Sequence, residues 1–155
     1  MIPSFLQDFL VKEVKNLFKG FTLKNANGEE APLNVYPQYL PARKGQKDTA
    51  HYPFVVVKLL SGEDPSEEDP NSCRVLFYCG IFDDNENYQG HKDCMNVMQK
   101  IYDHLTRHWV FDKKYEVQYP ISWTLTDEDF YPYYYGGLET TWTVGKVTRQ
   151  DDDLT

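Results

Sequence analysis

The chain has 155 residues, 41% of them hydrophobic and 15% aromatic, which suits one domain with a real core. Its formal net charge of −8 argues against a general nucleic-acid binder, because neutralising phosphates requires an excess of Lys and Arg. No apolar stretch approaches the roughly 20 residues of a membrane helix, and residues 1–4 lack the basic start of a signal peptide.

The first predicted element is a helix over residues 4–18. Its apolar residues recur every three or four positions and form one stripe. They are Leu6, Phe9, Leu10, Val14, Leu17 and Phe18. Ser4 with Gln7 fits a capping box, in which the Ser side chain accepts a hydrogen bond from a free backbone N–H. Gly20 is suited to end the helix, because glycine takes the left-handed conformation without penalty.

A short strand at residues 21–23 and a turn at 25–28 follow this helix. Residues 33–40 then form an extended segment that Pro37 interrupts. Because proline cannot donate a ladder hydrogen bond, this segment is predicted as an edge strand or an irregular arm.

Residues 41–51 are predicted to form a mobile loop with a local excess of positive charge. Its basic residues are Arg43, Lys44 and Lys47, and no acid occurs in residues 31–47. In an acidic protein, such a loop is a candidate to contact an acidic patch on a neighbouring copy. A solvated linker is the alternative interpretation.

Two strands with an acidic loop between them form the central predicted hairpin. Residues 53–60 are apolar and β-branched, and residues 73–82 alternate in the manner of a strand. The loop is longer than the roughly two to five residues of most hairpin loops. Its carboxylates are Glu63, Asp64, Glu67, Glu68 and Asp69. We expect this loop to be mobile in an isolated subunit, because like charges repel and nothing apolar anchors them.

The three cysteines are predicted to be buried and reduced. Cys73 and Cys79 lie on the more apolar face of residues 73–82, which should face the core, and Cys94 lies on the apolar face of the second helix. An odd count with no other sign of a disulfide framework favours free thiols in a cytosolic product.

A second helix is predicted over residues 88–108. Asn85 or Asn87 can cap it, and the neighbouring acids suit the positive end of the helix dipole. Its predicted apolar face carries His91, Cys94, Met95, Met98, Ile101, Tyr102, Leu105 and Trp109. His104 and His108 are spaced to share a metal, but the sequence places no third ligand. Two surface histidines at the negative end of the dipole explain the pair better.

Strands at residues 115–119 and 121–126, separated by Pro120, follow the second helix. Residues 138–147 form a closing strand with Leu138, Thr140, Trp142 and Val144 on one face. No internal boundary appears, so we expect a single domain over residues 1–150 and an acidic, flexible tail over 151–155.

Residues 127–137 combine an acidic triplet with a tyrosine-rich loop. Tyr133, Tyr134 and Tyr135 are candidates for a protein interface, because tyrosine offers an apolar ring and a polar tip. An equally good interpretation is that these tyrosines form a loop folded back on the sheet. A stacking platform for single-stranded nucleic acid is disfavoured, since the adjacent acids repel phosphate.

No catalytic signature is present in the sequence. It has no G-x-S-x-G elbow, no Walker loop and no G-x-G-x-x-G. The acids lie in runs, which are usually solvated faces, and the helical phase of Cys94 directs it to the core. We therefore expect a protein that is not an enzyme and that uses no cofactor or metal.

The order of these elements resembles the tail-terminator, or tail-completion, proteins of long-tailed bacteriophages and prophages. The matching segments are residues 52–64 (YPFVVVKLLSGED), 75–82, the helix with Asp93, 95–98 (MNVM) and Ile101, 121–123 (ISW), 131–136 (YPYYYG) and 139–142 (ETTW). The resemblance covers roughly residues 1–147. The basic residues 43–47 and the acidic residues 151–153 are not part of it.

The resemblance implies an α+β protein with a mostly antiparallel β-sheet packed against two helices. It also implies a ring of copies, typically a hexamer, that caps the head-proximal end of the tail tube, stops tube polymerisation and joins the tail to the head or neck. The partners would be the chain itself, the tail tube protein and a connector protein, with no membrane. DNA would pass through the ring without specific binding, because carboxylates that line it repel phosphates. The protein would be made in the host bacterial cytoplasm and end in the virion.

Three other interpretations remain open. The chain is another phage neck or tail component, such as a head-closure or tube protein, that shares the fold. Alternatively, it is a non-viral cytosolic protein-binding module with an acidic partner-facing loop. The third is a small hydrolase whose site the sequence does not reveal.

Overall fold

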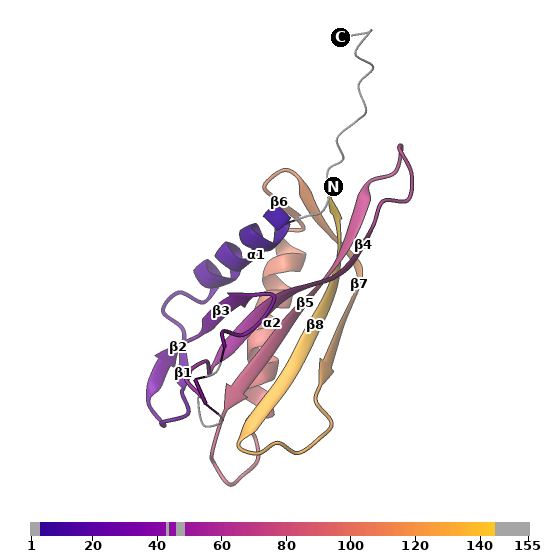
Figure 1. Cartoon of the computed structure of the whole chain (residues 1–155). Helices are drawn as coiled ribbons and strands as arrows, with labels where there is room; N and C mark the ends of the chain where they lie inside the picture. Colours follow the sequence, from indigo (N-terminus) through magenta and orange to yellow (C-terminus); the bar gives the residue numbers. More distant parts are fainter. Residues whose placement is uncertain (1–3, 43, 46–48, 145–155) are drawn as a thin grey trace.

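Two long antiparallel strands form the centre of the structure. The computed structural model describes residues 4–42, 44–45 and 49–144. In it, β5 (Asn71–Phe82) and β8 (Tyr133–Val144) pair along their whole length within a sheet of order β3-β4-β5-β8-β7-β6 (Figure 1). All neighbouring strands of this sheet are antiparallel except β3 and β4, which are parallel.

The remaining elements flank this pair. They are α1 (Ser4–Leu17), β1 (Thr22–Lys24), β2 (Glu30–Pro32), β3 (Asn34–Pro37), β4 (Phe54–Glu63), α2 (His91–Arg107), β6 (Val110–Phe111) and β7 (Tyr115–Leu125). Strands β1 and β2 form a separate small antiparallel sheet. No helix in the described ranges is long and apolar enough to cross a membrane.

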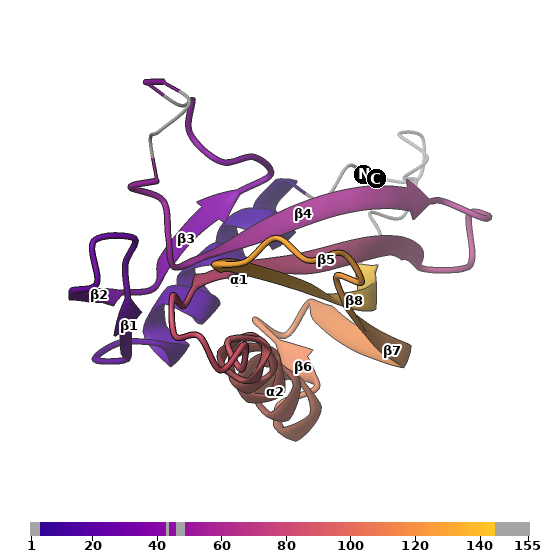
Figure 2. The same cartoon turned by 90° about the horizontal axis from the view of Figure 1, so that it is seen from below.

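Residues of both helices share one core with the inner face of the six-stranded sheet, and Figure 2 shows α2 below the sheet and α1 behind β3 and β4. The core lies between the helices and this inner face, and it includes Leu10, Val57, Phe77, Ile101 and Trp142. The prediction of an α+β domain, with a mostly antiparallel sheet on two helices, is therefore confirmed. The three cysteines are free and buried, as predicted.

Helix α1 has the predicted apolar stripe, but Gln7 does not serve it as a cap. The Gln7 amide donates to the side-chain oxygen of Gln38 and to the carbonyl of Val57, both at 2.9 Å. Gln38 in turn bonds the N–H and the C=O of Leu59, at 2.9 and 3.1 Å. These amides tie α1 to the edge of the sheet where β3 ends.

Helix α2 begins three residues later than predicted, and its predicted caps are used elsewhere. Gly90 is the N-cap residue, and no side-chain hydrogen bond caps this end of the helix. Asn85 and Asn87 instead accept hydrogen bonds from the N–H two residues further on, which builds consecutive Asx turns. Gly90 is required there because an added Cβ would lie 2.3 Å from the ring of Tyr134.

The predicted apolar face of α2 is only partly buried. Cys94, Met98, Ile101 and Leu105 are buried, as is Val97, which the prediction omitted. The placement of four other residues in the core was wrong: Met95, Tyr102 and Trp109 are exposed and His91 is half-buried. The apolar stripe of α2 is therefore wider than the part of the helix surface that is buried.

The strands are longer than the sequence predicted. Strand β4 continues through Ser61 and Gly62 with a register shift, because the long partner β5 keeps it paired. Strand β7 passes through Pro120 as one strand, again with a register shift. Strand β8 begins at Tyr133, so the tyrosines predicted in a loop lie in the sheet. The predicted strand end at 145–147 and the tail at 151–155 lie outside the described residues.

A buried hydrogen-bond relay fixes the register of the two central strands. Trp142 is fully buried, and its indole N–H donates to the hydroxyl of Thr140 at 2.8 Å. That hydroxyl donates to the carbonyl of Val75 on β5 at 2.9 Å. Thr140 thereby satisfies the only polar atom of the largest buried side chain and links it to the partner strand.

Replacing Thr140 with Val should lower the free energy of unfolding by about 1–3 kcal/mol, because the indole N–H loses its acceptor in a dry core. Thr140→Ser keeps the hydroxyl and should retain most of the relay. Urea denaturation of both variants checks this. Equal losses in the two variants would show that the methyl group, rather than the hydroxyl, stabilises the strand.

Candidate interaction surfaces

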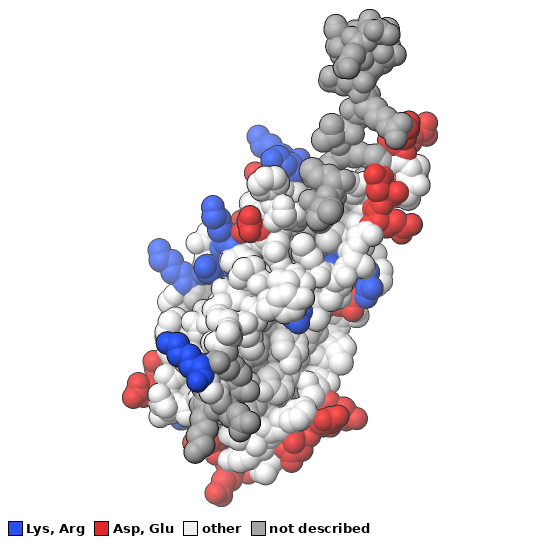
Figure 3. Space-filling model, in the orientation of Figure 1, with Lys and Arg blue, Asp and Glu red and all other residues white. Residues whose placement is uncertain are grey.

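Carboxylates gather at both ends of the central strands (Figure 3). At one end, Glu63 is the last residue of β4, and the loop that carries Asp64, Glu67, Glu68 and Asp69 is fully exposed. Within this loop the Ser66 hydroxyl donates to the carboxylate of Asp69 at 2.9 Å. We call residues 63–69 the acidic hairpin tip. It is an exposed loop between two hairpin strands, as predicted, and its mobility stays a prediction.

The other end of the sheet combines two acidic groups that the sequence kept apart. Asp83, Asp84 and Glu86 follow β5, while residues 127–129 precede β8. Because β5 and β8 are antiparallel neighbours, these segments meet: the N–H of Asp83 donates to the carbonyl of Pro132 at 2.9 Å, and the Tyr131 hydroxyl donates to the carbonyl of Asp84. Sequence spacing does not reveal this meeting, because it depends on strand pairing.

The predicted basic loop leaves β3 and returns to the start of β4. Lys44 is exposed on it, whereas Arg43 and Lys47 lie outside the described residues. The loop returns at Tyr52, at the end of β4 opposite the acidic hairpin tip. Because β3 is parallel to β4 and Pro37 pairs with Val57, the basic loop leaves the sheet beside the middle of β4, whereas the hairpin tip follows the last residue of β4.

The candidate tyrosines divide between the two faces of the sheet. Tyr134 points to the helix side and packs against the core. Tyr133 and Tyr135 point to the opposite face, where they join an aromatic group that we call the outer aromatic cluster. It consists of Tyr52, Phe54, Tyr78, Phe82, Tyr133 and Tyr135.

Close ring contacts and one hydroxyl pair hold the outer aromatic cluster together. The rings of Tyr78 and Tyr135 are parallel with centroids 6.0 Å apart, and those of Tyr52 and Tyr133 are 4.8 Å apart. The hydroxyls of Tyr52 and Tyr135 lie 2.5 Å apart. The ring of Phe54 fills the space over Gly80, where an added Cβ would lie 2.2 Å from it.

Burial raises the pKa of two phenols of this cluster, Tyr52 and Tyr78. Desolvation, with a smaller contribution from the Tyr135 hydrogen bond, raises the pKa of Tyr52 far above its ordinary value. Desolvation and Tyr135 also raise the pKa of Tyr78 to about 12. The cluster is thus a neutral patch between two acidic ends.

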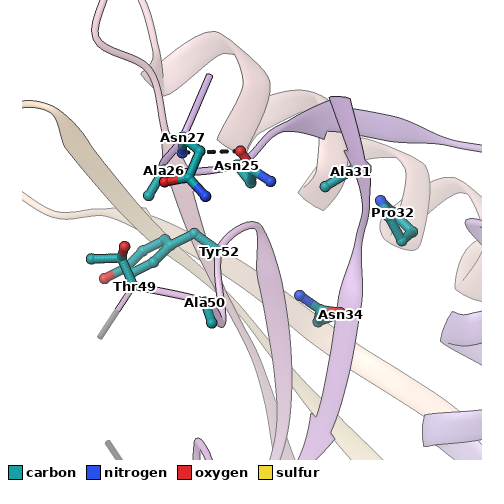
Figure 4. Close-up of a pocket in the computed structure, with 9 residues that line it drawn as sticks. All are labelled: Asn25, Ala26, Asn27, Ala31, Pro32, Asn34, Thr49, Ala50 and Tyr52. Atoms are coloured by element: carbon teal, nitrogen blue, oxygen red, sulfur yellow. Dashed lines mark hydrogen bonds between the residues drawn. The ribbon is translucent and has the colours of Figure 1, made fainter. Parts of the chain in front are cut away.

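A polar hollow of about 450 Å³ lies between the β1–β2 turn and the segment that enters β4 (Figure 4). Its lining is Asn25, Ala26, Asn27, Ala31, Pro32, Asn34, Thr49, Ala50 and Tyr52. The side chain of Asn25 is held by the N–H groups of Asn27 and Glu29, and Asn34 donates to the carbonyl of His51. Among the described residues, the lining offers amides and hydroxyls for hydrogen bonds but no carboxylate, imidazole or thiol for acid–base or nucleophilic chemistry.

The histidine pair of α2 has a structural partner. The Nε2 atom of His104 lies 3.0 Å from the carboxylate of Glu13 and so connects α2 to α1. The ring of His108 lies beside it, with centroids 5.2 Å apart and the ring planes tilted by 57°. No group of three or more metal-ligating side chains occurs in the described ranges.

An apolar groove of about 370 Å³ lies between α2 and β7, and it was not predicted from the sequence. It is lined by Met95, Met98, Gln99, Tyr102, Ile121, Trp123 and Leu138. Trp123 is 62% exposed although it pairs with buried Leu138 on β8. The alternation of β7 does predict an inward Trp123, but it does not predict that α2 leaves this position uncovered.

Replacing Tyr52 with Phe should lower the free energy of unfolding by about 1 kcal/mol at neutral pH, because the Tyr135 hydroxyl loses its partner. The pKa of Tyr52 is raised on folding, so its contribution is present below pH about 10 and is lost as pH rises above that value. Tyr52→Phe should therefore make the alkaline loss of stability shallower in urea denaturation series. Tyr119→Phe, at a 75% exposed position, is the control and should change neither quantity.

The sequence matches no protein-family model and no curated protein.

Proposed function

We propose that this protein is a structural virion protein, the tail terminator of a long-tailed bacteriophage or prophage. Copies form a ring, a hexamer, that caps the head-proximal end of the tail tube, stops its polymerisation and joins it to the head or neck. The sequence resemblance over residues 1–147 supports this proposal, and the α+β architecture is compatible with it. The role is structural rather than enzymatic.

The acidic hairpin tip is the observation that carries the proposal. Its carboxylates are exposed and lie where β4 ends and β5 begins, and every described residue from 61 to 70 is exposed. In a ring, such tips suit the lumen or the tube-facing side. A lumen lined with carboxylates repels DNA phosphates, so the duplex passes without specific binding.

Head-to-tail contacts between copies would build the ring. The basic loop joins β3 to the start of β4 and its sequence contains Arg43, Lys44 and Lys47, whereas the hairpin tip follows the end of β4, so a contact between these two different sites on neighbouring copies is head-to-tail, as a cyclic ring requires. Exposed ion pairs contribute only about 0–1 kcal/mol each, so charge would set the register of the contact. Apolar side chains would hold it, and half-buried Tyr133 and Tyr135 are candidates.

The partners in this proposal are the tail tube protein, a connector or neck protein and further copies of the chain. The protein is made in the host cytoplasm and ends in the virion. Its function is tested by adding it to polymerising tube protein from the same phage or prophage. Elongation should stop, and electron microscopy should show a ring at one end of each tube. Tubes that lengthen at the same rate with and without the protein would refute the terminator role.

Reversing Arg43, Lys44 and Lys47 to Glu should weaken the ring without unfolding the subunit, and the effect should be larger at low salt, where screening is weak. Mass measurement by light scattering at low and high salt checks this. Reversal of Lys12, Lys15 and Lys19 gives a control with the same change in net charge on exposed positions of α1 and its C-terminal end. An unchanged ring mass in the triple variant at low salt would remove the electrostatic part of the proposal.

A further inference from the structure

Two of the three cysteines meet in the core, where α2 passes over β5 and β8. Cys79 of β5 is the cross-strand partner of Gly136 on β8, and Cβ positions of such partners lie about 4.5–5.5 Å apart on the same face. The Sγ atom of Cys94 on α2 lies over that glycine, 2.8 Å from the place that a Cβ of Gly136 would occupy. The Cys94 thiol therefore fills the space that Gly136 leaves empty, beside the thiol of Cys79.

The surroundings of the two thiols agree with this contact. Burial, and after it the neighbouring Cys94 thiol, raises the pKa of Cys79 well above its ordinary value. Cys79 is 1% exposed and Cys94 0%. Methyl groups of Met98 and Leu125 are the other atoms closest to the empty Cβ position of Gly136. The two thiols thus lie side by side among apolar groups.

The start of α2 offers the route by which a small oxidant reaches the pair. Cys94 is the fourth residue of α2, whose N-cap residue Gly90 receives no side-chain hydrogen bond. Residues 84–89, which precede this end, are all exposed. Helix ends and exposed segments open locally at a lower free-energy cost than paired central strands. Opening at the first turn of α2 exposes Cys94 while β5 and β8 stay paired.

Cys73 is buried as well, but it lies too far from the pair to join it. It stands on the same strand as Cys79, about 20 Å away at a rise of about 3.3 Å per residue. The Cα atoms of a disulfide are separated by no more than about 7 Å. Cys73 is therefore an internal control for the reactivity of a buried thiol in this protein.

We propose that Cys79 and Cys94 form a disulfide when the protein meets hydrogen peroxide, and that this bond clamps the start of α2 to β5. The Cys94 thiolate attacks one peroxide oxygen, the O–O bond breaks, and a water leaves a sulfenic acid on the sulfur. The Cys79 sulfur then attacks that sulfur, the S–O bond breaks, and a second water leaves. The two cysteines lose a pair of electrons to the peroxide, and their two protons end in the waters.

The bond forms within one subunit, so it is independent of the proposed ring. It closes a loop over residues 79–94, which carries the acids Asp83, Asp84 and Glu86 between β5 and α2. Closing a loop restricts the unfolded chain and so favours the folded protein. A reducing cytosol keeps the pair as two thiols, and an oxidising environment adds the crosslink.

Peroxide treatment of the folded protein, followed by alkylation in denaturant and mass spectrometry, tests the bond. The reduced chain should take up three alkyl groups, one on each free cysteine. The oxidised chain should take up one, and a digest should contain a peptide that joins Cys79 to Cys94. The melting temperature should rise by roughly 5–10 °C on oxidation. A thiol reductant should reverse both changes.

Alanine variants of the three cysteines show which thiols react. Cys79→Ala and Cys94→Ala should each lose the crosslink and the rise in melting temperature, with every variant compared with its own reduced form. Cys73→Ala is the matched control, because Cys73 is 2% exposed but distant from the pair, and it should keep both.

Three outcomes would overturn the proposal. In the first, all three thiols are alkylated after peroxide treatment. In the second, the oxidised product is a sulfinic acid or a disulfide that involves Cys73. In the third, the bond between Cys79 and Cys94 forms but leaves the melting temperature unchanged or lower, which would show that it does not clamp α2 to β5.

Discussion

The pairing of β5 with β8 is the constraint on which the rest of the structure depends. A one-residue slip of β8 against β5 would turn Leu138 and Trp142 from the core to the outer face. The Thr140 relay opposes such a slip, because only the observed register places its hydroxyl between the Trp142 indole and the Val75 carbonyl. Both helices pack on the inner face of this pair, so their positions follow from its register.

The same pairing also determines where charge and aromatic surface lie. It places the acids after β5 beside the acids before β8, and it places Tyr135 opposite Gly80, where the ring of Phe54 from β4 fills the space. Acids are thereby concentrated at the ends of the sheet, and the outer face between them carries aromatic rings next to the Arg74–Glu139 ion pair and Lys58. Such a mixed surface suits contacts in which charge orients two molecules and apolar surface holds them.

Local pattern was enough to predict the two helices and the core face of β5, because burial on one face leaves a period in the sequence. The fold class was expected from the family resemblance, and the short strands β2 and β6 were not predicted. The period of β5 placed Cys73, Val75, Phe77, Cys79 and Ile81 in the core, and all five are buried. The errors share one cause, which is dependence on a distant partner. Met95 and Trp123 carry the apolar residues expected of core positions, yet the sheet and α2 do not cover them. Gln7 fits a cap by its spacing, yet Gln38 and Val57 bind its amide because β3 and β4 lie beside α1. The tyrosines of β8 were predicted to form a loop because Pro132 and two glycines flank them. They form a strand because β5 is long enough to pair with them as far as Tyr133.

The two margins of the six-stranded sheet differ in one respect that bears on how far any assembly can grow. At the β3 margin, the Gln38 side chain occupies the place of a further strand residue beside Leu59, and Gln7 of α1 covers it. That margin is closed by the chain's own amides over this stretch, whereas the second half of β7 is not closed by any described residue. A further strand therefore finds no free backbone groups beside Leu59, and side-chain amides that occupy an edge in this way limit edge-to-edge association of sheets.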